Sequence, residues 1–285
     1  MPDLSGGSAP AAGPTPVERA PRGTTQLSIA ARRRVRGVFG LVVGAGGFLL
    51  VWTLLSEFVV GKFLLPSPLR IAPRMWDIVR SGAFIDQFVP TILRLAYGFG
   101  LALAIGFPIG YLMGTSRYWR AFFHDMVMVA GSVPGITYAV MALVVLGISV
   151  LGPVISVGLV SMPYVAINVA EGLDSVDRRL VQMSAAFGRR RPAVVRHVLM
   201  PSVAPFAFAG VRLSFAFAWK VEQLTEVFGS SSGVGFQIRK EFEDFSIPGT
   251  LAWVLLFIIF MLLVERFVLV RLERYLFRWR LEDQA

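Results

Sequence analysis

The stretch LDSVDRRLVQMSAAFGRRRPAVVRHVLMPSVAP, Leu173 to Pro205, separates two long apolar runs and carries the clearest local signals in the chain. Its first apolar residues recur at steps of three and four, which is typical of a helix with one apolar face. These residues are Leu173, Val176, Leu180, Met183 and Phe187. Asp174 or Ser175 can cap the start of this helix, because either side chain accepts a hydrogen bond from a free backbone amide. The first half therefore predicts a short amphipathic helix.

The second half of this stretch carries residues that end one helix and begin another. Gly188 tolerates the positive φ that helix ends often require, and Arg189 follows where the negative end of the helix dipole favours cations. Pro192 suits the first turn of a second helix, because the amide that proline lacks has no intrahelical partner there. Pro201 is expected to end that second helix. We therefore expect a helix-turn-helix over about residues 172–202.

The rest of the chain is apolar enough for a lipid environment. Of 285 residues, 55% are hydrophobic and 16% are charged, whereas soluble domains average roughly 45–50% and about 25%. A helix needs about 20 mostly apolar residues to cross a hydrocarbon core of ~30 Å. Runs of this kind cover residues 37–58, 92–113, 126–147, 153–170, 203–222 and 251–270. We expect an all-α polytopic membrane protein of about six transmembrane helices, the third and fourth forming a tight hairpin.

The positively charged residues orient these spans, because short cytoplasmic loops carry an excess of Lys and Arg. On one side lie Arg32, Arg33, Arg34, Arg36, Arg117, Arg120, Arg178, Arg179, Arg189, Arg190, Arg191, Arg196, Arg271, Arg274, Arg278 and Arg280. This bias predicts that both termini and the loop 172–202 are cytoplasmic. The net charge of +10 follows the span ends and forms no single basic face, so it does not indicate nucleic-acid binding. Residues 1–36 predict a disordered basic tail.

Two segments on the other side are too long to be simple turns. Residues 62–90 place Ile71, Met75, Ile78 and Val79 at spacings that suit an amphipathic interfacial helix. Residues 228–248 combine serines and glycines with mixed charges. This second segment is either a docking surface for an external partner or a solvated loop.

Several kinds of chemistry are missing from the sequence. The chain has no Cys and two His, which argues against a thiolate or histidine-rich metal site. It also has no G-x-x-x-x-G-K-[ST] phosphate loop, so any nucleotide-derived energy must come from another chain. A membrane enzyme would need a nucleophile or paired carboxylates, and a channel would need a filter pattern. Neither feature is found, and we predict no catalytic or metal residues.

The segment QMSAAFGRRRPAVVRHVLMP, Gln182 to Pro201, resembles the cytoplasmic signature of binding-protein-dependent ABC importer permeases. That signature reads Glu-Ala-Ala, three residues, Gly, then an apolar stretch ending in Leu-Pro; Gln182 replaces its Glu and Ser184 replaces an Ala. Five further segments resemble the nitrate/sulfonate/taurine branch of this family. They are LLPSPLRI (64–71), TILRLAYGFGLALAIGFPIGYLMG (91–114), SVPGITYAVMALVVLGI (132–148), AWKVEQLTE (218–226) and GVGFQI (233–238).

This resemblance implies a permease of the cell's inner (plasma) membrane, with a permease domain over residues 59–280 that follows a first transmembrane helix at 37–58. It implies a pair of permease chains, most often identical, two copies of a separate ATPase that holds ATP and Mg, and a periplasmic or lipid-anchored solute-binding protein. The solute would be small, such as nitrate, taurine or another sulfonate. The residues expected to couple the loop to the ATPase are Gln182, Ser184, Ala185, Gly188, Arg189, Pro192 and Pro201. The alternative for the loop is a helix pair that rests on lipid headgroups.

Charged residues inside a span are costly and usually face the interior of a bundle or a water-filled path. The candidates are Arg94, Arg212, Lys220, Glu222 and Glu226. Glu222 and Glu226 share a helix face, because they are four residues apart, and Arg94 is expected to pair with one of them. These residues either line the translocation pathway or its outer gate, or they form structural ion pairs or extend to a membrane interface. The glycines at 98, 106, 110 and 114 are expected to let helices approach closely.

Overall fold

The computed structural model describes residues 43–61 and 63–276. All regular elements in these ranges are helical, which confirms the predicted all-α fold. The chain divides into two units, Met1–Leu55 and Ser56–Ala285. The first unit contributes an apolar helix that continues to Val59 through the π-helical turn η1, Leu55–Val59. The predicted start of this span, at residue 37, lies outside the described residues.

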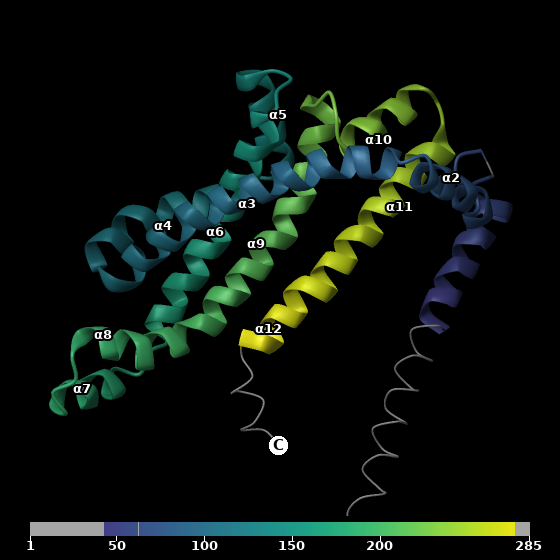
Figure 1. The fold of residues 1–285 in the computed structure, drawn as a ribbon. Helices are drawn as coiled ribbons and strands as arrows, with labels where there is room; N and C mark the ends of the chain where they lie inside the picture. The colour runs from purple at the N-terminus through teal and green to yellow at the C-terminus, as the bar shows by residue number, and fades with distance from the viewer. Residues whose placement is uncertain (1–42, 62, 277–285) are drawn as a thin grey trace, which may run out of the picture. The chain divides into compact units, whose positions relative to one another are not determined.

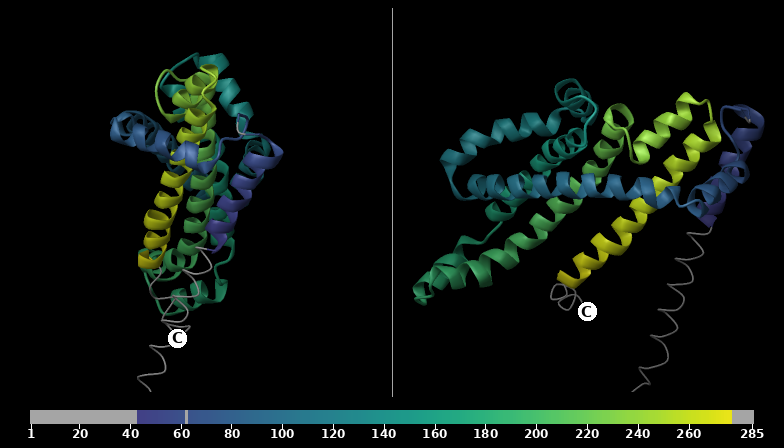
Figure 2. Two further views of the ribbon diagram at one scale, coloured as in Figure 1. Left: turned by 90° about the vertical axis from the view of Figure 1, so that its right-hand side faces the viewer. Right: turned by 45° about the horizontal axis from the view of Figure 1, so that its top comes forward.

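The second unit contains the remaining helices (Figure 1). They are α2 Pro68–Arg80, α3 Ala83–Thr115, α4 Arg117–Ser132, α5 Gly135–Leu146, α6 Leu151–Asp174, α7 Arg178–Ala186, α8 Arg191–Val194, η2 Val195–Leu199, α9 Met200–Gly229, α10 Val234–Glu243, α11 Ile247–Val264, η3 Glu265–Leu269 and α12 Val270–Leu276. Helix α6 packs against both α3 and α9. Helices α7 and α8 lie at one end of α6 and α9, and α5 and α10 lie at the other, as Figure 2 also shows.

The long apolar helices agree with the predicted count of about six. Four helical stretches are long and apolar enough to cross a membrane: 83–115, 151–174, 191–229 and 247–276. Helices α4 and α5 together form a further candidate, bent by 93°. The described part of the first predicted span, Val43–Val59, is a shorter apolar helix.

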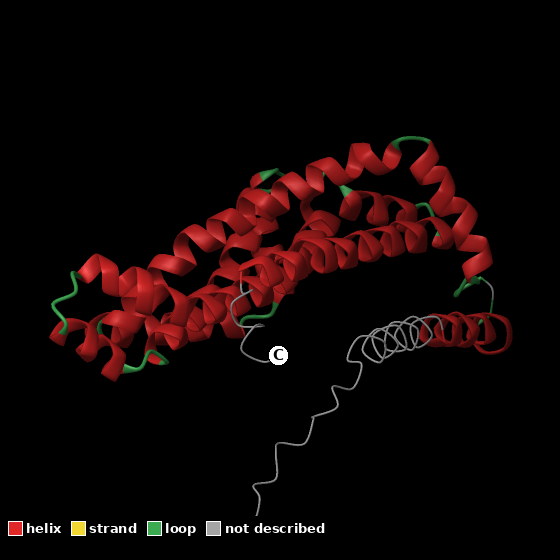
Figure 3. Cartoon of the chain, turned by 60° about the horizontal axis from the view of Figure 1, so that its bottom comes forward, coloured by secondary structure: helices red, strands yellow, loops and turns green. Residues whose placement is uncertain are grey.

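The bend corrects the prediction of one straight span over residues 126–147. Val133 has φ −68° and ψ 127°, because a proline at 134 disfavours the helical conformation of the residue before it. Helix α5 packs against α6, the helix that follows it, as the predicted hairpin requires. Loops joining the helices are drawn in Figure 3.

Glycines on one side of α3 bring this helix against α6, as predicted from their spacing. A β-carbon built at Gly98 would lie 2.7 Å from the carbonyl oxygen of Val154, and one at Gly110 would lie 2.6 Å from that of Ala166. A β-carbon built at Gly106 would lie 2.9 Å from the carbonyl oxygen of Met162, so this glycine is also close to α6. The two backbones are therefore too close for any side chain at these positions.

The segments predicted on the outer side are also helical. Helix α2 buries Ile71 and Ile78 and packs against α11, but Val79, which was placed on the same apolar face, is exposed. The second segment is not a solvated loop, because its helix α10 packs against both α9 and α11. Arg74 of α2 and Glu241 of α10 join the two segments at 3.6 Å.

We predict opposite effects for the same substitution at two glycines of α3. Gly110→Ala should destabilise the protein by about 1–3 kcal/mol, because the added methyl overlaps the backbone of α6. Gly100→Ala is the matched control, since nothing lies within 4 Å of a β-carbon built there; it should stabilise the helix by roughly 0.5–1 kcal/mol. Thermal unfolding of the purified protein in detergent measures both. Equal effects at the two sites would contradict this packing.

Candidate functional site: a buried ion pair and a helical loop

A buried ion pair joins α3 to the far end of α9. Arg94 Nη1 lies 2.6 Å from Glu226 Oε1, and the two side chains are 6% and 0% exposed. The same guanidinium donates to the carbonyl oxygen of Ser232 at 2.8 Å and to its Oγ at 2.7 Å. Arg94 therefore ties α9 and the turn after it to α3. This pairing was one of the two predicted for Arg94.

Further residues of α3 complete the cluster around Glu226. The Thr91 hydroxyl donates to Glu226 Oε2 at 2.8 Å and accepts the amide of Val234 at 2.9 Å. The side-chain oxygen of Gln87 accepts the amide of Gly233 at 2.9 Å. With the amide of Gly235, 3.0 Å from Glu226 Oε2, each carboxylate oxygen receives at least one donor. Such charge-assisted bonds stabilise a buried carboxylate.

The glycines after α9 are explained by the carboxylate that they surround. Gly233 has φ 107°, and a β-carbon there would overlap the carboxylate of Glu226. A β-carbon at Gly235 would lie 2.5 Å from the Glu226 Cβ and 2.7 Å from the carbonyl oxygen of Gln223. Glycine is therefore required at both positions for steric reasons. The motif GVGFQI is recognisable in the sequence, but no local pattern indicates this role of its glycines or the contacts of Gln87, Thr91 and Ser232.

The other predicted intramembrane charges do not join this ion pair. Arg212 is half-exposed and faces Glu265 at 3.3 Å and Glu273 at 3.5 Å, beside a cavity of about 350 Å³ between α9 and the η3–α12 segment. The ammonium of Lys220 lies 5.5 Å from the ring centre of Phe217. With Glu222, the five predicted residues thus occupy four different environments.

Glu222 differs from the other predicted charges because it is buried without a cationic partner among the described residues. It is fully buried, one turn before Glu226 on the same face of α9. Neither of its carboxyl oxygens receives a hydrogen-bond donor from the part of the chain that the structure describes, and the carboxyl group that it faces is that of Glu226.

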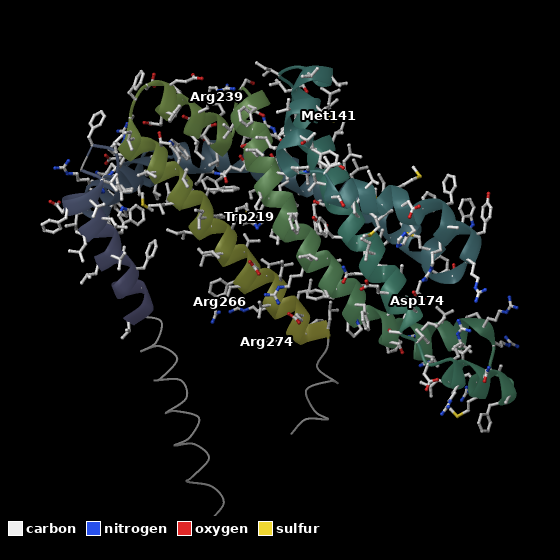
Figure 4. All side chains as sticks on the ribbon, turned by 180° about the vertical axis from the view of Figure 1, so that it is seen from behind. Met141, Asp174, Trp219, Arg239, Arg266 and Arg274 are labelled. Atoms are coloured by element: carbon white, nitrogen blue, oxygen red, sulfur yellow. The ribbon has the colours of Figure 1, made fainter. Side chains whose placement is uncertain are left out.

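The loop between α6 and α9 lies at the opposite end of these helices from the ion pair. In Figure 4, Asp174 and Arg274 mark the loop end, whereas Arg239 and Met141 mark the other end. Helix α6 continues to Asp174, so Leu173 belongs to the spanning helix and not to the loop helix. The cap of α7 is Asp177, whose side chain accepts the amide of Arg179 at 2.8 Å. The predicted caps, Asp174 and Ser175, were therefore wrong, because the spanning helix is longer than expected.

Gly188 ends α7 with the geometry that the sequence analysis anticipated. Its φ is 65°, and its amide donates to the carbonyl oxygen of Ala185 at 2.9 Å. The amide of Arg189 donates to the carbonyl oxygen of Ser184 at 3.1 Å. These two bonds form a Schellman motif, which satisfies carbonyl groups at the end of the helix. Pro192 lies in the first turn of α8, as predicted.

Pro201 does not end the second loop helix, contrary to prediction. The helix continues from α8 through η2 into α9, so residues Arg191–Gly229 form one stretch of 39 residues. The amide of Met200 bonds to the carbonyl oxygen of Val195, five residues back. A proline inside a helix removes an amide donor and crowds the carbonyl one turn earlier. The wider π-helical turn before Pro201 accommodates that defect.

The surface of the loop combines exposed apolar side chains with arginines. Phe187 is 76% exposed and Met183 is 53% exposed. A cavity of about 390 Å³ lies between the two loop helices. It is lined by Ser184, Arg189, Ala193, Val194, His197 and Val198.

Together these features define a polytopic helical membrane protein, with spans packed through small residues and a structured loop at one end. Within the described residues, no group of three or more His, Cys, Asp or Glu could hold a metal ion. The chain belongs to the family of binding-protein-dependent transport system inner membrane components, whose model matches residues 106–280. It is a permease subunit of an ABC importer, and nucleotide binding belongs to a partner ATPase.

Several relatives share most of their length with this chain. A probable ABC transporter permease protein of Brucella melitensis is 26% identical over 211 residues, covering 74% of this chain and 83% of the relative. The putative aliphatic sulfonates transport permease protein SsuC of Bacillus subtilis is 26% identical over 250 residues, with coverages of 87% and 90%. The taurine transport system permease protein TauC of Escherichia coli is 23% identical, with coverages of 82% and 86%.

A solved structure shares the fold. The MetNI methionine ABC transporter, in inward facing conformations, has a chain that matches with a TM-score of 0.58 at 20% identity. The match covers 71% of this chain and 97% of that one.

We predict that Arg94 and Glu226 stabilise the fold only as a pair. Arg94→Met should lower the free energy of unfolding by about 3–5 kcal/mol, because it leaves the Glu226 carboxylate buried without its cation. The double substitution Arg94→Met with Glu226→Gln should cost less than the sum of the two single changes, since neither charge is then left alone. Denaturation of all three variants measures this coupling. Additive losses would contradict it.

Proposed function

We propose that this permease moves a small anion into the cytoplasm, and that its partner ATPase acts on it through the loop helices α7 and α8. The continuity of the helix Arg191–Gly229, 39 residues long, carries this proposal. At a rise of about 1.5 Å per residue, a helix of this length exceeds the thickness of a hydrocarbon core. If the ATPase displaces α8, this continuous helix therefore transmits the movement to the region of Glu226.

The chemistry of the loop surface suits a protein partner better than a purely aqueous environment. Apolar side chains surrounded by polar groups are typical of the centre and rim of protein interfaces. Phe187, Met183 and Leu180 supply the apolar centre, and the neighbouring arginines supply the rim. The residues proposed to form or position this surface are Gln182, Ser184, Ala185, Gly188, Arg189, Pro192 and Pro201.

The proposed assembly contains two permease copies of the same chain, two ATPase copies and an external solute-binding protein. The permease domain would cover residues 59–280, with both termini and the loop 172–202 on the cytoplasmic side. Helices α2 and α10 would then lie on the outer side, where the binding protein delivers solute. The Arg94–Glu226 pair at the end of α9 would belong to the outer gate of the pathway.

The proposed anionic solute rests on the relatives and on the cations of α9. Relatives are named for the transport of aliphatic sulfonates, nitrate and bicarbonate, which are anions, and of taurine, whose sulfonate group is anionic although its ammonium group balances the charge. A further relative is named for the transport of formylaminopyrimidine. Lys220 and Arg212 are exposed on α9 in the single chain, and we place both along the pathway together with Glu222. Screening the cognate binding protein against small anions by calorimetry tests the solute class. Binding of neutral ligands alone would contradict it.

We predict that a charge at the tip of the loop prevents ATPase binding. Phe187→Asp places a carboxylate in the apolar centre of the proposed interface, where it would be desolvated, and should weaken the affinity at least about tenfold. Phe245→Asp is the matched control, because Phe245 is 87% exposed in the turn before α11, at the other end of α9. Affinity of the purified ATPase for permease in nanodiscs gives the readout. Equal affinities for the two variants would contradict the proposed docking site.

We also predict that Gly188→Pro abolishes the stimulation of ATP hydrolysis while leaving membrane insertion intact. Proline cannot adopt the φ of 65° found at Gly188, and it lacks the amide that bonds to Ala185. The turn between α7 and α8 should therefore lose its geometry. ATPase activity of the reconstituted complex and membrane fractionation measure the two properties. Normal solute uptake by this variant would contradict a coupling role.

A further inference from the structure

Two fully buried carboxyl groups lie one helical turn apart on α9, and they have very different surroundings. Glu226 accepts bonds from Arg94, Thr91 and Gly235. Glu222 is equally buried, at 0% exposure, yet among the described residues its oxygens receive no donor, and the neighbouring Glu226 carboxyl is the group that they face. Buried polar groups are nearly always hydrogen-bonded, so an exception needs an explanation.

One cation is available for these two carboxyl groups. Arg94 is the only Lys or Arg among the buried residues that the structure describes. Lys220, two positions from Glu222, is exposed and lies over the rings of Phe217 and Trp219. A shared metal ion does not fit the pair, because the oxygens of Glu226 already receive N–H and O–H donors.

The spacing of the two carboxyl groups makes them equivalent partners for Arg94 in two positions of α9. Residues four apart lie on the same face of a helix, separated along its axis by about 6 Å. A shift or tilt of α9 along α3 would therefore bring Glu222 toward the guanidinium as Glu226 moves away. Packed helices are known to move past each other between such discrete positions.

The connection of α9 to the loop supplies the cause of such a movement. The helix that carries both carboxyl groups begins at Arg191, in the proposed ATPase-docking loop. Arg94 also holds the turn after α9 through both oxygens of Ser232. If Arg94 leaves Glu226, it also leaves Ser232, and the turn between α9 and α10 is released.

We propose that Glu222 is the second binding position of the Arg94 guanidinium, and that Arg94 changes from Glu226 to Glu222 during the transport cycle. Glu222 is then a positioning residue of the permease, without a bonding role in the state described here. This inference rests on the proposed function, because the ATPase drives the change through α9. The Arg94–Glu226 pair holds one conformation, and the Arg94–Glu222 pair holds the other.

The test uses Glu222→Gln in the complete transporter, with its ATPase and binding protein, reconstituted in liposomes. The amide keeps the size of the side chain but cannot form the ion pair, so solute flux should fall by about tenfold or more through loss of the second conformation. The melting temperature should stay equal or rise, because the substitution removes a carboxyl group that faces the Glu226 carboxylate and receives no donor in the starting state. Asp125→Asn is the charge-matched control, since the Asp125 side chain is 92% exposed, and its flux should stay normal.

A labelling experiment follows the turn itself. The chain contains no Cys, so Ser230→Cys, at a position in the same turn that is 1% exposed, gives the permease a single thiol that is buried in this conformation. Maleimide labelling of this thiol should accelerate when ATP is added to the otherwise unchanged complex. In the Glu222→Gln background, ATP should leave the labelling rate unchanged.

The outcomes separate the inference from the proposed function. Absence of ATP-driven flux in the unsubstituted complex would overturn the proposed function. Normal flux in that complex, with equally fast flux in Glu222→Gln, would overturn the inference alone. A lower melting temperature of Glu222→Gln would also overturn it, because Glu222 would then contribute to the stability of the starting conformation.

Discussion

The pairing of Arg94 with Glu226 is the interaction on which the outer end of the molecule depends. A charge buried at this depth is tolerated only when a partner and further hydrogen bonds replace its water. That requirement fixes the neighbours of Glu226: a hydroxyl from Thr91, an amide from Gly235, and space that only glycine leaves at position 233. One carboxylate therefore explains why three separate segments meet here.

Helix packing serves a different purpose along the spans. Without a hydrophobic driving force in lipid, helices associate through close contact of small residues. Gly98 and Gly110 place α3 directly on the backbone of α6, and Gly210 does the same for α9, where a β-carbon would lie 2.6 Å from the Asn168 Cβ. Helix α6 thus holds α3 and α9 close together along their length. Beyond these glycine contacts, the Arg94–Glu226 ion pair lies at one end of α9 and the loop between α6 and α9 lies at the other.

Local sequence signals are sufficient to predict some helix ends and not others. Gly188 was identified from its neighbours alone, and its positive φ is what a helix end requires. Pro134 and Pro201 were both misjudged, in opposite directions. The first breaks a span, since its preceding residue is extended, whereas the second is absorbed by the π-helical turn before it. The same residue type has either effect, depending on whether the surrounding helix can widen.

The sequence by itself determined the membrane class and the helical loop, which follow from apolar length, arginine placement and helical period. It also identified the family, through motifs such as the segment from Gln182 to Pro201, and the charged residues Arg94, Glu222 and Glu226 as candidates for burial. All of these are local properties of the chain. Only the tertiary structure decided that Arg94 binds Glu226 and leaves Glu222 without a partner, and that glycines 233 and 235 exist to make room for a side chain on another helix. The Arg94–Glu226 contact joins segments more than 100 residues apart in the sequence. A local sequence pattern cannot show which atoms of such distant segments meet.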